Sequence, residues 1–97
     1  MEETGIKKDI IDKIRSLAQK YGIKKVILFG SRARGDYGRT SDIDLAVSGG
    51  NIAHFSLDVD EETSTPLKYD IVNLDGNVQE GLLETIEMEG TVLYEKI

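Results

Sequence analysis

The sequence predicts an α/β protein of the α+β kind, with a small mixed β-sheet, helices packed on it, and a single domain over residues 1–97. Segments with helical periodicity alternate with short β-branched or aromatic runs, which is the pattern of helices that cover a sheet. The length of 97 residues, with 39% hydrophobic and 31% charged residues, suits one globular domain. The sequence has no cysteine, which excludes disulfides and thiolate metal sites as supports of the fold.

The N-terminal segment predicts a helix followed by a strand. Apolar residues recur at helical spacing over about 7–20, and Gly22 lies where a glycine often ends a helix. The next run, 25–29, is β-branched and aromatic and is too short for a helix, so we expect a strand there. This strand stops at Gly30 and Ser31, where the chain is expected to turn.

The middle of the chain predicts a ligand-binding loop, a second strand and a further helix. Residues 31–40 contain two glycines and three arginines, typical of one short helical turn and a loop whose backbone can approach a ligand. Residues 42–47 alternate and then become apolar, as in a strand that runs from solvent into a core. Residues 51–64 fit a strand or a helix, and we favour the helix, with Asn51 as its N-cap.

The C-terminal part predicts a strand, a helix and a final strand. The first strand covers 69–73, an apolar run with one acidic residue inside it. Asn77 and Glu80 predict a capping pair for a helix that carries Leu82, Leu83 and Ile86. We expect this helix to end near Gly90, before a short strand over 91–94.

Charge and hydropathy patterning limit the possible partners. Twelve basic and eighteen acidic residues give a formal charge of −6, which opposes stable binding to a nucleic-acid backbone. The basic residues are nevertheless concentrated within 20–39, a local site that suits a small polyanion. The N-terminus is acidic and no long apolar stretch occurs, so we expect a cytoplasmic protein without membrane attachment.

Three aspartates predict a metal site. Asp42 and Asp44 are two residues apart in a predicted strand, so their carboxylates point to the same face. Two like charges this close repel unless a cation such as Mg²⁺ neutralises them. Asp70 stands inside a run that we read as a buried strand, where an unpaired charge would cost several kcal/mol. A shared metal ion would give Asp70 its partner.

Gly30 and Ser31 predict a phosphate-binding turn beside this metal site. The glycine permits a sharp turn, and the serine hydroxyl and nearby backbone N–H groups can hold phosphate oxygens. Arg32 and Arg34, with Arg39 further along, can neutralise more phosphate charge. Carboxylates, metal and phosphate together indicate nucleotidyl transfer, in which two Mg²⁺ ions stabilise the attacking and leaving oxygens.

The segments Phe29–Asp36 and Ser41–Val47 resemble the motif of the DNA polymerase beta-like nucleotidyltransferases, and more narrowly the minimal nucleotidyltransferase family. The resemblance extends from the first predicted helix to Tyr94. It implies the nucleotidyltransferase fold, with ATP as the substrate and two Mg²⁺ ions as cofactors. It also implies that Asp42 and Asp44 bind both ions, that Asp70 binds the catalytic ion and helps to activate the attacking hydroxyl, and that Gly30 and Ser31 contact the triphosphate.

The same resemblance implies a protein partner. Members of this family pair with a helical HEPN-domain protein as a toxin–antitoxin couple, and some transfer AMP from ATP to a tyrosine of that HEPN toxin. The larger relatives carry further domains that bind the acceptor, so here we expect another protein to supply it, in a hetero- or homo-oligomer. Two alternatives stay open: a non-catalytic nucleotide-binding antitoxin that covers its partner, and an aminoglycoside-like small-molecule nucleotidyltransferase that needs a second subunit.

Overall fold

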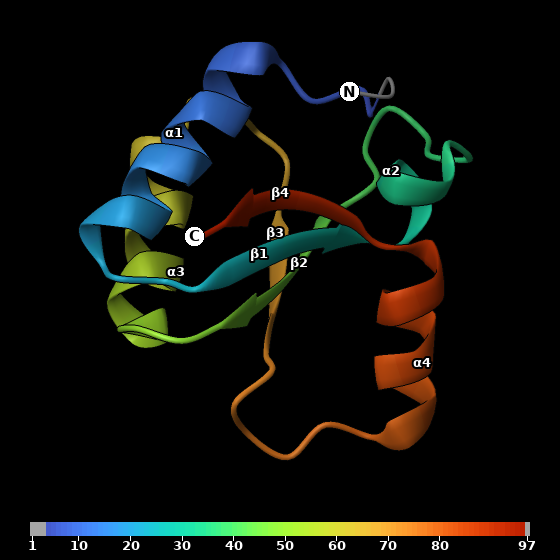
Figure 1. Ribbon diagram of the computed structural model, residues 1–97. Helices are drawn as coiled ribbons and strands as arrows, with labels where there is room; N and C mark the ends of the chain where they lie inside the picture. The colour runs from blue at the N-terminus through green and yellow to red at the C-terminus, as the bar shows by residue number, and fades with distance from the viewer. Residues whose placement is uncertain (1–3, 97) are drawn as a thin grey trace.

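The computed structural model describes residues 4–96. Helices and strands follow one another along the chain (Figure 1), in the order α1 (Lys8–Lys20), β1 (Lys25–Phe29), α2 (Ser31–Arg34), β2 (Ile43–Ser48), α3 (Ile52–Glu62), β3 (Tyr69–Asn73), α4 (Glu80–Glu89) and β4 (Thr91–Glu95). This order confirms the predicted alternation, including the helix favoured over 51–64. Among residues 4–96, no helix is both long and apolar enough to cross a membrane.

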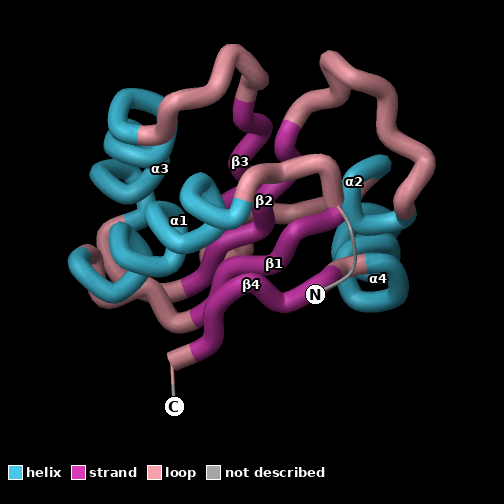
Figure 2. The backbone as a smooth tube through the Cα atoms, turned by 90° about the horizontal axis from the view of Figure 1, so that it is seen from above, coloured by secondary structure: helices cyan, strands magenta, loops and turns pink. Residues whose placement is uncertain are grey.

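The four strands form one mixed sheet in the order β3-β2-β1-β4, which Figure 2 shows from above. β1 pairs antiparallel with both β2 and β4. β2 pairs parallel with β3, because α3 returns the chain to the same end of the sheet between these two strands. The predicted mixed sheet is therefore confirmed, and β3 and β4 are its edge strands.

Helices cover both faces of the sheet (Figure 1). α1 and α3 lie on one face, where Ile14 and Phe55 pack against residues such as Leu45 in the larger hydrophobic core. α4 lies on the other face, where Ile86 packs against Ala46 in a smaller core. Side chains alternate between faces along a strand, so every second residue of β2 faces α4.

Local hydrogen bonds account for the end of α1 and the start of α3. Gly22, with a φ of +67°, follows Tyr21, the C-cap residue of α1, and the amides of Gly22 and Ile23 donate to the carbonyls of Gln19 and Ala18. This is the double hydrogen bond with which a glycine commonly ends a helix. At the start of α3, the side chain of Asn51 accepts a hydrogen bond from the amide of His54, which confirms Asn51 as the predicted N-cap.

The predicted capping pair of α4 is wrong. The helix begins at Glu80, and its N-cap is Gln79, whose side chain makes no capping hydrogen bond. Asn77 lies two residues further upstream, too early for its side chain to cap the first turn. The helix is held in place by packing, because Ile86 buries against the sheet and no side chain of the described residues caps its first turn.

Candidate active site

Two neighbouring strands bring the predicted carboxylates to one end of the sheet. In the parallel pair of β2 and β3, Asp44 is in register with Asp70. Asp44 lies two residues before Ala46, and Asp70 two residues before Val72, and both of these apolar residues belong to the small core under α4. By strand alternation the two aspartates therefore share the α4 face. Asp42 directly precedes β2.

The three aspartates differ in exposure. Asp44 is partly buried, whereas Asp42 and Asp70 are exposed. The expectation that Asp70 lies within a buried strand is wrong, because β3 is an edge strand with no fully buried residue. An exposed carboxylate is solvated by water, so its charge needs no partner. The argument that burial requires a metal ion at Asp70 therefore does not hold. Its exposure instead leaves it accessible to a substrate.

Gly30 lies directly against the carboxylate of Asp44. Phe29, the last residue of β1, is in register with Asp44, so the residue that follows it turns past that side chain. The backbone of Gly30 has φ +76° and ψ −157°, a conformation that is essentially restricted to glycine. A Cβ atom at this position would also collide with Oδ2 of Asp44. The turn is thus compatible only with glycine, for two independent reasons.

Ser31 begins the four-residue helix α2, immediately after this turn. The carbonyl of Gly30 accepts hydrogen bonds from the amides of Ala33 and Arg34, and the carbonyl of Ser31 from those of Gly35 and Asp36. The leading N–H groups of a helix have no intrahelical acceptor, and here they belong to residues 31 and 32. The hydroxyl of the partly buried Ser31 therefore lies beside these two backbone N–H donors.

The local charges act on Asp44. Partial burial, followed by the negative charges of Asp70 and Asp42, raises the pKa of the Asp44 carboxyl above its ordinary value of 3.8, while Arg34 opposes this increase. Negative charge is thus concentrated at this end of the sheet beyond what Arg34 compensates. A cation bound there would be attracted by all three carboxylates.

The structure separates the two predicted arginines. Arg34 is exposed and forms ion pairs with Asp36 at 3.2 Å and with Glu89, at the end of α4, at 3.1 Å. Arg34 also lies near enough to Asp44 to affect its pKa. The sequence offered no sign of Glu89, because only the fold brings the end of α4 beside α2.

Arg32 is buried, with 2% of its surface exposed, and lines a cavity together with Ile10 of α1. Its Nε donates to the carbonyl of Ser41 at 3.1 Å, and its Nη1 to the carbonyl of Thr4 at 3.0 Å. Its guanidinium also lies over the ring of Tyr37, at 4.9 Å from the centroid. These contacts tie the N-terminal segment to the loop before β2.

The donor chemistry of this site fits a hard divalent cation. Carboxylate oxygens are the ligands that Mg²⁺ prefers, and Asp44 supplies one whose pKa is raised by partial burial first and then by the charges of Asp70 and Asp42. Across residues 4–96, however, no three His, Cys, Asp or Glu side chains are grouped to hold one metal ion. Asp42, Asp44 and Asp70 are therefore a suitable donor set without being arranged as a closed coordination shell.

Comparisons with known proteins identify the family of the chain. A sequence profile of the family described as polymerase beta, nucleotidyltransferase, matches residues 12–97. A candidate protein adenylyltransferase from Methanocaldococcus jannaschii is 45% identical over 67 residues, which cover 67% of this chain and 65% of that relative. The chain thus spans slightly less than two-thirds of the length of this curated relative.

Solved structures share the fold. A toxin–antitoxin complex with AMP-PNP is 26% identical, with a TM-score of 0.70, over 89% of this chain and 73% of that chain. A candidate minimal nucleotidyltransferase is 29% identical, with a TM-score of 0.66, over 84% of this chain and 86% of that chain. A variant of the toxin–antitoxin pair MntA–HpeT, 23% identical over 89% of this chain and 73% of that chain, has a TM-score of 0.69 and matches in fold.

Proposed function

The chain belongs to the polymerase beta nucleotidyltransferase family, and on that premise we propose that it transfers AMP from ATP to a protein hydroxyl with the help of Mg²⁺. The acceptor is a tyrosine of a helical HEPN toxin, and the chain acts as the antitoxin of that pair. This proposal is supported by the candidate protein adenylyltransferase among its relatives and by the toxin–antitoxin complex with AMP-PNP among its structural neighbours.

One observation carries the proposal. Asp44 has the Gly30 turn on one side, through the β1–β2 pair, and Asp70 on the other, through the β2–β3 pair. A glycine turn, which we propose binds phosphate, and an exposed carboxylate thus flank the same aspartate. Transfer to a hydroxyl needs this arrangement, because the nucleotide phosphates and the attacking oxygen must meet at one place.

The turn would orient the triphosphate. The hydroxyl of Ser31 and the leading amides of α2 donate hydrogen bonds to phosphate oxygens, and hydrogen bonds to charged acceptors are stronger than those between neutral groups. Gly30 lets the backbone come this close, because a side chain there would occupy the place of the Asp44 carboxylate. Arg34, held by Asp36 and Glu89, adds positive charge beside the turn.

Asp70 would act on the acceptor. Its carboxylate is exposed at the sheet edge, so an incoming tyrosine hydroxyl can reach it and pass its proton to it. The phenolic oxygen then forms a bond to the α-phosphorus, and the bond from that phosphorus to the β-phosphate oxygen breaks to release pyrophosphate. When bound by Asp42, Asp44 and Asp70, two Mg²⁺ ions supply charge stabilisation for the attacking and leaving oxygens.

The proposal is tested by incubating the chain and the product of the neighbouring reading frame with ATP and Mg²⁺. Intact-mass spectrometry should find one added AMP on the partner and none on the chain itself. Asp70→Asn should lower the rate of transfer by several orders of magnitude while most ATP binding is retained. Asp60→Asn is the matched control, because Asp60 is an exposed carboxylate on α3, the helix on the opposite face of the sheet.

Two results would replace the proposal by one of its alternatives. If Asp70→Asn abolishes transfer but the variant still neutralises the partner, the chain acts by covering the partner. If AMP is transferred to an aminoglycoside-type alcohol and never to the partner, the chain is a small-molecule transferase. A rate of transfer that is unchanged in Asp70→Asn would contradict the role proposed for Asp70.

A further inference from the structure

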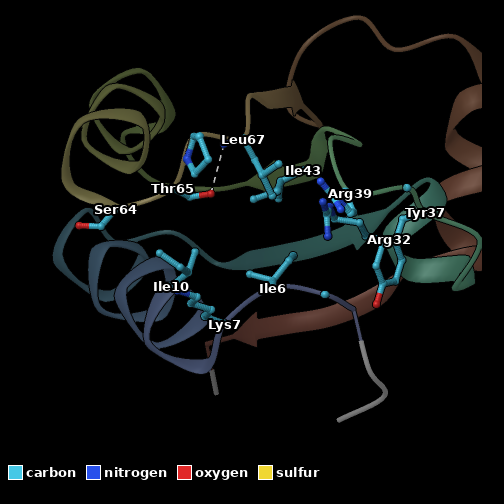
Figure 3. A pocket seen from close by; sticks show the side chains of 13 residues that line it. Ile6, Lys7, Ile10, Arg32, Tyr37, Arg39, Ile43, Ser64, Thr65 and Leu67 are labelled. Atoms are coloured by element: carbon cyan, nitrogen blue, oxygen red, sulfur yellow. Dashed lines mark hydrogen bonds between the residues drawn. The ribbon is translucent and has the colours of Figure 1, made fainter.

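A cavity of about 340 Å³ lies on the α1 side of the sheet, apart from the carboxylates. Figure 3 shows Ile6 and Ile10 on one side of it and Ile43 and Leu67 on the other, with Arg32, Arg39 and Tyr37 gathered at one end. Its volume is at the lower end of the range found for ligand pockets. Because its facing walls are aliphatic, it suits an apolar side chain.

A second hollow adjoins this cavity. It shares Arg39, Pro66 and Leu67 with the cavity, and it is also lined by Asp42. We call the two adjoining hollows together the Arg39 groove. One part of the groove is thus the aliphatic cavity, and the other part has one of the three carboxylates in its lining.

The charges along the Arg39 groove are distributed unevenly. Its described lining residues include four cations, namely Lys7, Arg32, Arg39 and Lys68, whereas Asp42 at one end is the single acidic side chain among them. Arg32 is buried and hydrogen-bonded only to carbonyl groups within residues 4–96, and no carboxylate of that part pairs with it within 4.0 Å. In a chain whose formal charge is −6, this is a localised cationic surface that suits an acidic ligand.

We propose that the Arg39 groove binds the acceptor polypeptide and selects a segment in which an acidic and an apolar side chain lie near the accepting tyrosine. The inference rests on the proposed function. The apolar side chain fills the aliphatic cavity, the acidic side chain pairs with Arg39, and the tyrosine lies at the Asp42 end. The groove would thus determine which hydroxyl is modified, a property that the three aspartates alone do not provide.

A polypeptide fits the groove better than a nucleic acid. The facing walls of the cavity are aliphatic, and the guanidinium of Arg32 already lies over one face of Tyr37, the aromatic ring among its described lining residues. Single-stranded nucleic acids are bound largely by stacking of their bases on aromatic rings, and this lining offers little aromatic surface for that contact. An oligoribonucleotide serves as the competitor that tests this distinction.

The experiment uses synthetic nonapeptides with a fixed central tyrosine and one varied flanking position at a time. With ATP and Mg²⁺, the full chain should modify peptides with Asp or Glu together with Leu or Ile on one side of the tyrosine at least tenfold faster than peptides with Lys. Arg39→Glu should reverse the acidic preference in favour of Lys. A reversed preference requires a folded protein, so loss of structure cannot produce it.

Binding is measured separately from transfer. A fluorescein-labelled acidic nonapeptide should bind the full chain, as followed by fluorescence anisotropy, and bind Arg39→Glu at least tenfold more weakly. Lys96→Glu is the control with the same charge change. Lys96 lies at the end of the sheet away from Asp42. It follows Glu95, which is in register with Lys25 at the start of β1, and Lys25 is in register with Ser48, the last residue of β2.

The outcomes separate this inference from the proposed function. If the acidic peptide binds and Arg39→Glu weakens it, but no peptide or protein is ever modified, the groove stands and the proposed transfer fails. If peptides are modified without acidic or apolar preference, the transfer stands and the groove assignment is overturned. Equal effects of Arg39→Glu and Lys96→Glu would also overturn it, as would stronger competition by an oligoribonucleotide than by the acidic peptide.

Discussion

At the scale of single residues, Gly30 and Asp44 depend on one another. The positive φ of Gly30 and the carboxylate that occupies the place of its missing side chain bring a backbone turn and a charged group into direct contact. Such a position combines backbone strain with close packing, and both are common where a ligand approaches the main chain. Substitutions at these two residues should therefore affect stability as well as activity.

Gly30→Ala should destabilise the protein. The backbone strain alone costs about 1–3 kcal/mol, and the added methyl group displaces Asp44. Gly81→Ala is the matched control, because Gly81 lies in α4 with nothing near the place where a Cβ would be added, and alanine should stabilise the helix by about 0.5–1 kcal/mol. Urea unfolding of both variants measures the difference. Equal stability of the two variants would contradict the Gly30 assignment.

Asp44→Asn should stabilise the protein without ligands near pH 7. Because the folded pKa of Asp44 is raised above 3.8, its ionised form weakens the fold, and this penalty disappears as the pH falls through the raised pKa towards the unfolded value. The wild-type protein should therefore gain stability from Asp44 on mild acidification, and the variant should lack that part of the pH dependence. Melting temperatures in chelator from pH 7 to pH 4 give the measurement, with Asp60→Asn as the control.

At the scale of elements, the two faces of the sheet have different tasks. α1 and α3 bury most of the apolar side chains, while α4 covers a smaller core and ends beside α2, where Glu89 reaches Arg34. The carboxylates share a face with α4, so the site lies on the side of the sheet that carries the smaller hydrophobic core. α3 connects β2 to β3. The parallel pairing that aligns Asp44 with Asp70 therefore depends on this helix.

Asn51→Ala should destabilise the protein by about 1 kcal/mol, because the side-chain oxygen that accepts the amide of His54 at 3.2 Å is lost. Asn77→Ala is the matched control. Asn77 is exposed and lies upstream of the first turn of α4, so its removal should change stability by less than about 0.5 kcal/mol. Chemical unfolding of the two variants measures both effects. A larger loss of unfolding free energy in Asn77→Ala than in Asn51→Ala would support Asn77 as the cap of α4.

At the scale of the whole molecule, charge is the dominant feature. A formal charge of −6 coexists with the cationic Arg39 groove, whose lining includes Asp42 at one end. An acidic polypeptide would thus approach the active site through the cationic groove, whereas a nucleotide with its cations would approach the carboxylates. Binding of either should stabilise a domain of this size appreciably, since small domains have narrow stability margins.

ATP with Mg²⁺ should raise the melting temperature of the protein. Ligand at a hundred times its dissociation constant adds about 2.7 kcal/mol to the free energy of unfolding. ATP in chelator should have little effect, because the carboxylates then repel the phosphates. Asp42→Asn should reduce the increase, whereas Asp60→Asn, which removes an exposed carboxylate of α3 on the opposite face of the sheet, should keep most of it. Differential scanning fluorimetry is the measurement, and an equal increase without metal would contradict the proposed metal ligands.

The sequence by itself determined the order and type of the elements, the family, and the residue types of the candidate site. These follow from local patterns: helical periodicity over α1, β-branched runs at β1 and β3, and the spacing from Gly30 and Ser31 to Asp42 and Asp44. The match of the family profile to residues 12–97 confirms the resemblance. The roles of the individual site residues stay predictions.

Only the tertiary structure decided what depends on neighbours distant in the sequence. Strand order made β3 an edge strand, so Asp70 is exposed although its own run of residues indicates burial. α4 begins without the cap that the Asn77 motif predicts, and Ile86 holds the helix against the sheet. Arg32 and Arg34 are two residues apart, yet one is buried against Thr4 and Ser41 and the other meets Glu89. Local patterns record what a segment prefers, whereas burial and charge pairing depend on which segments the fold brings together.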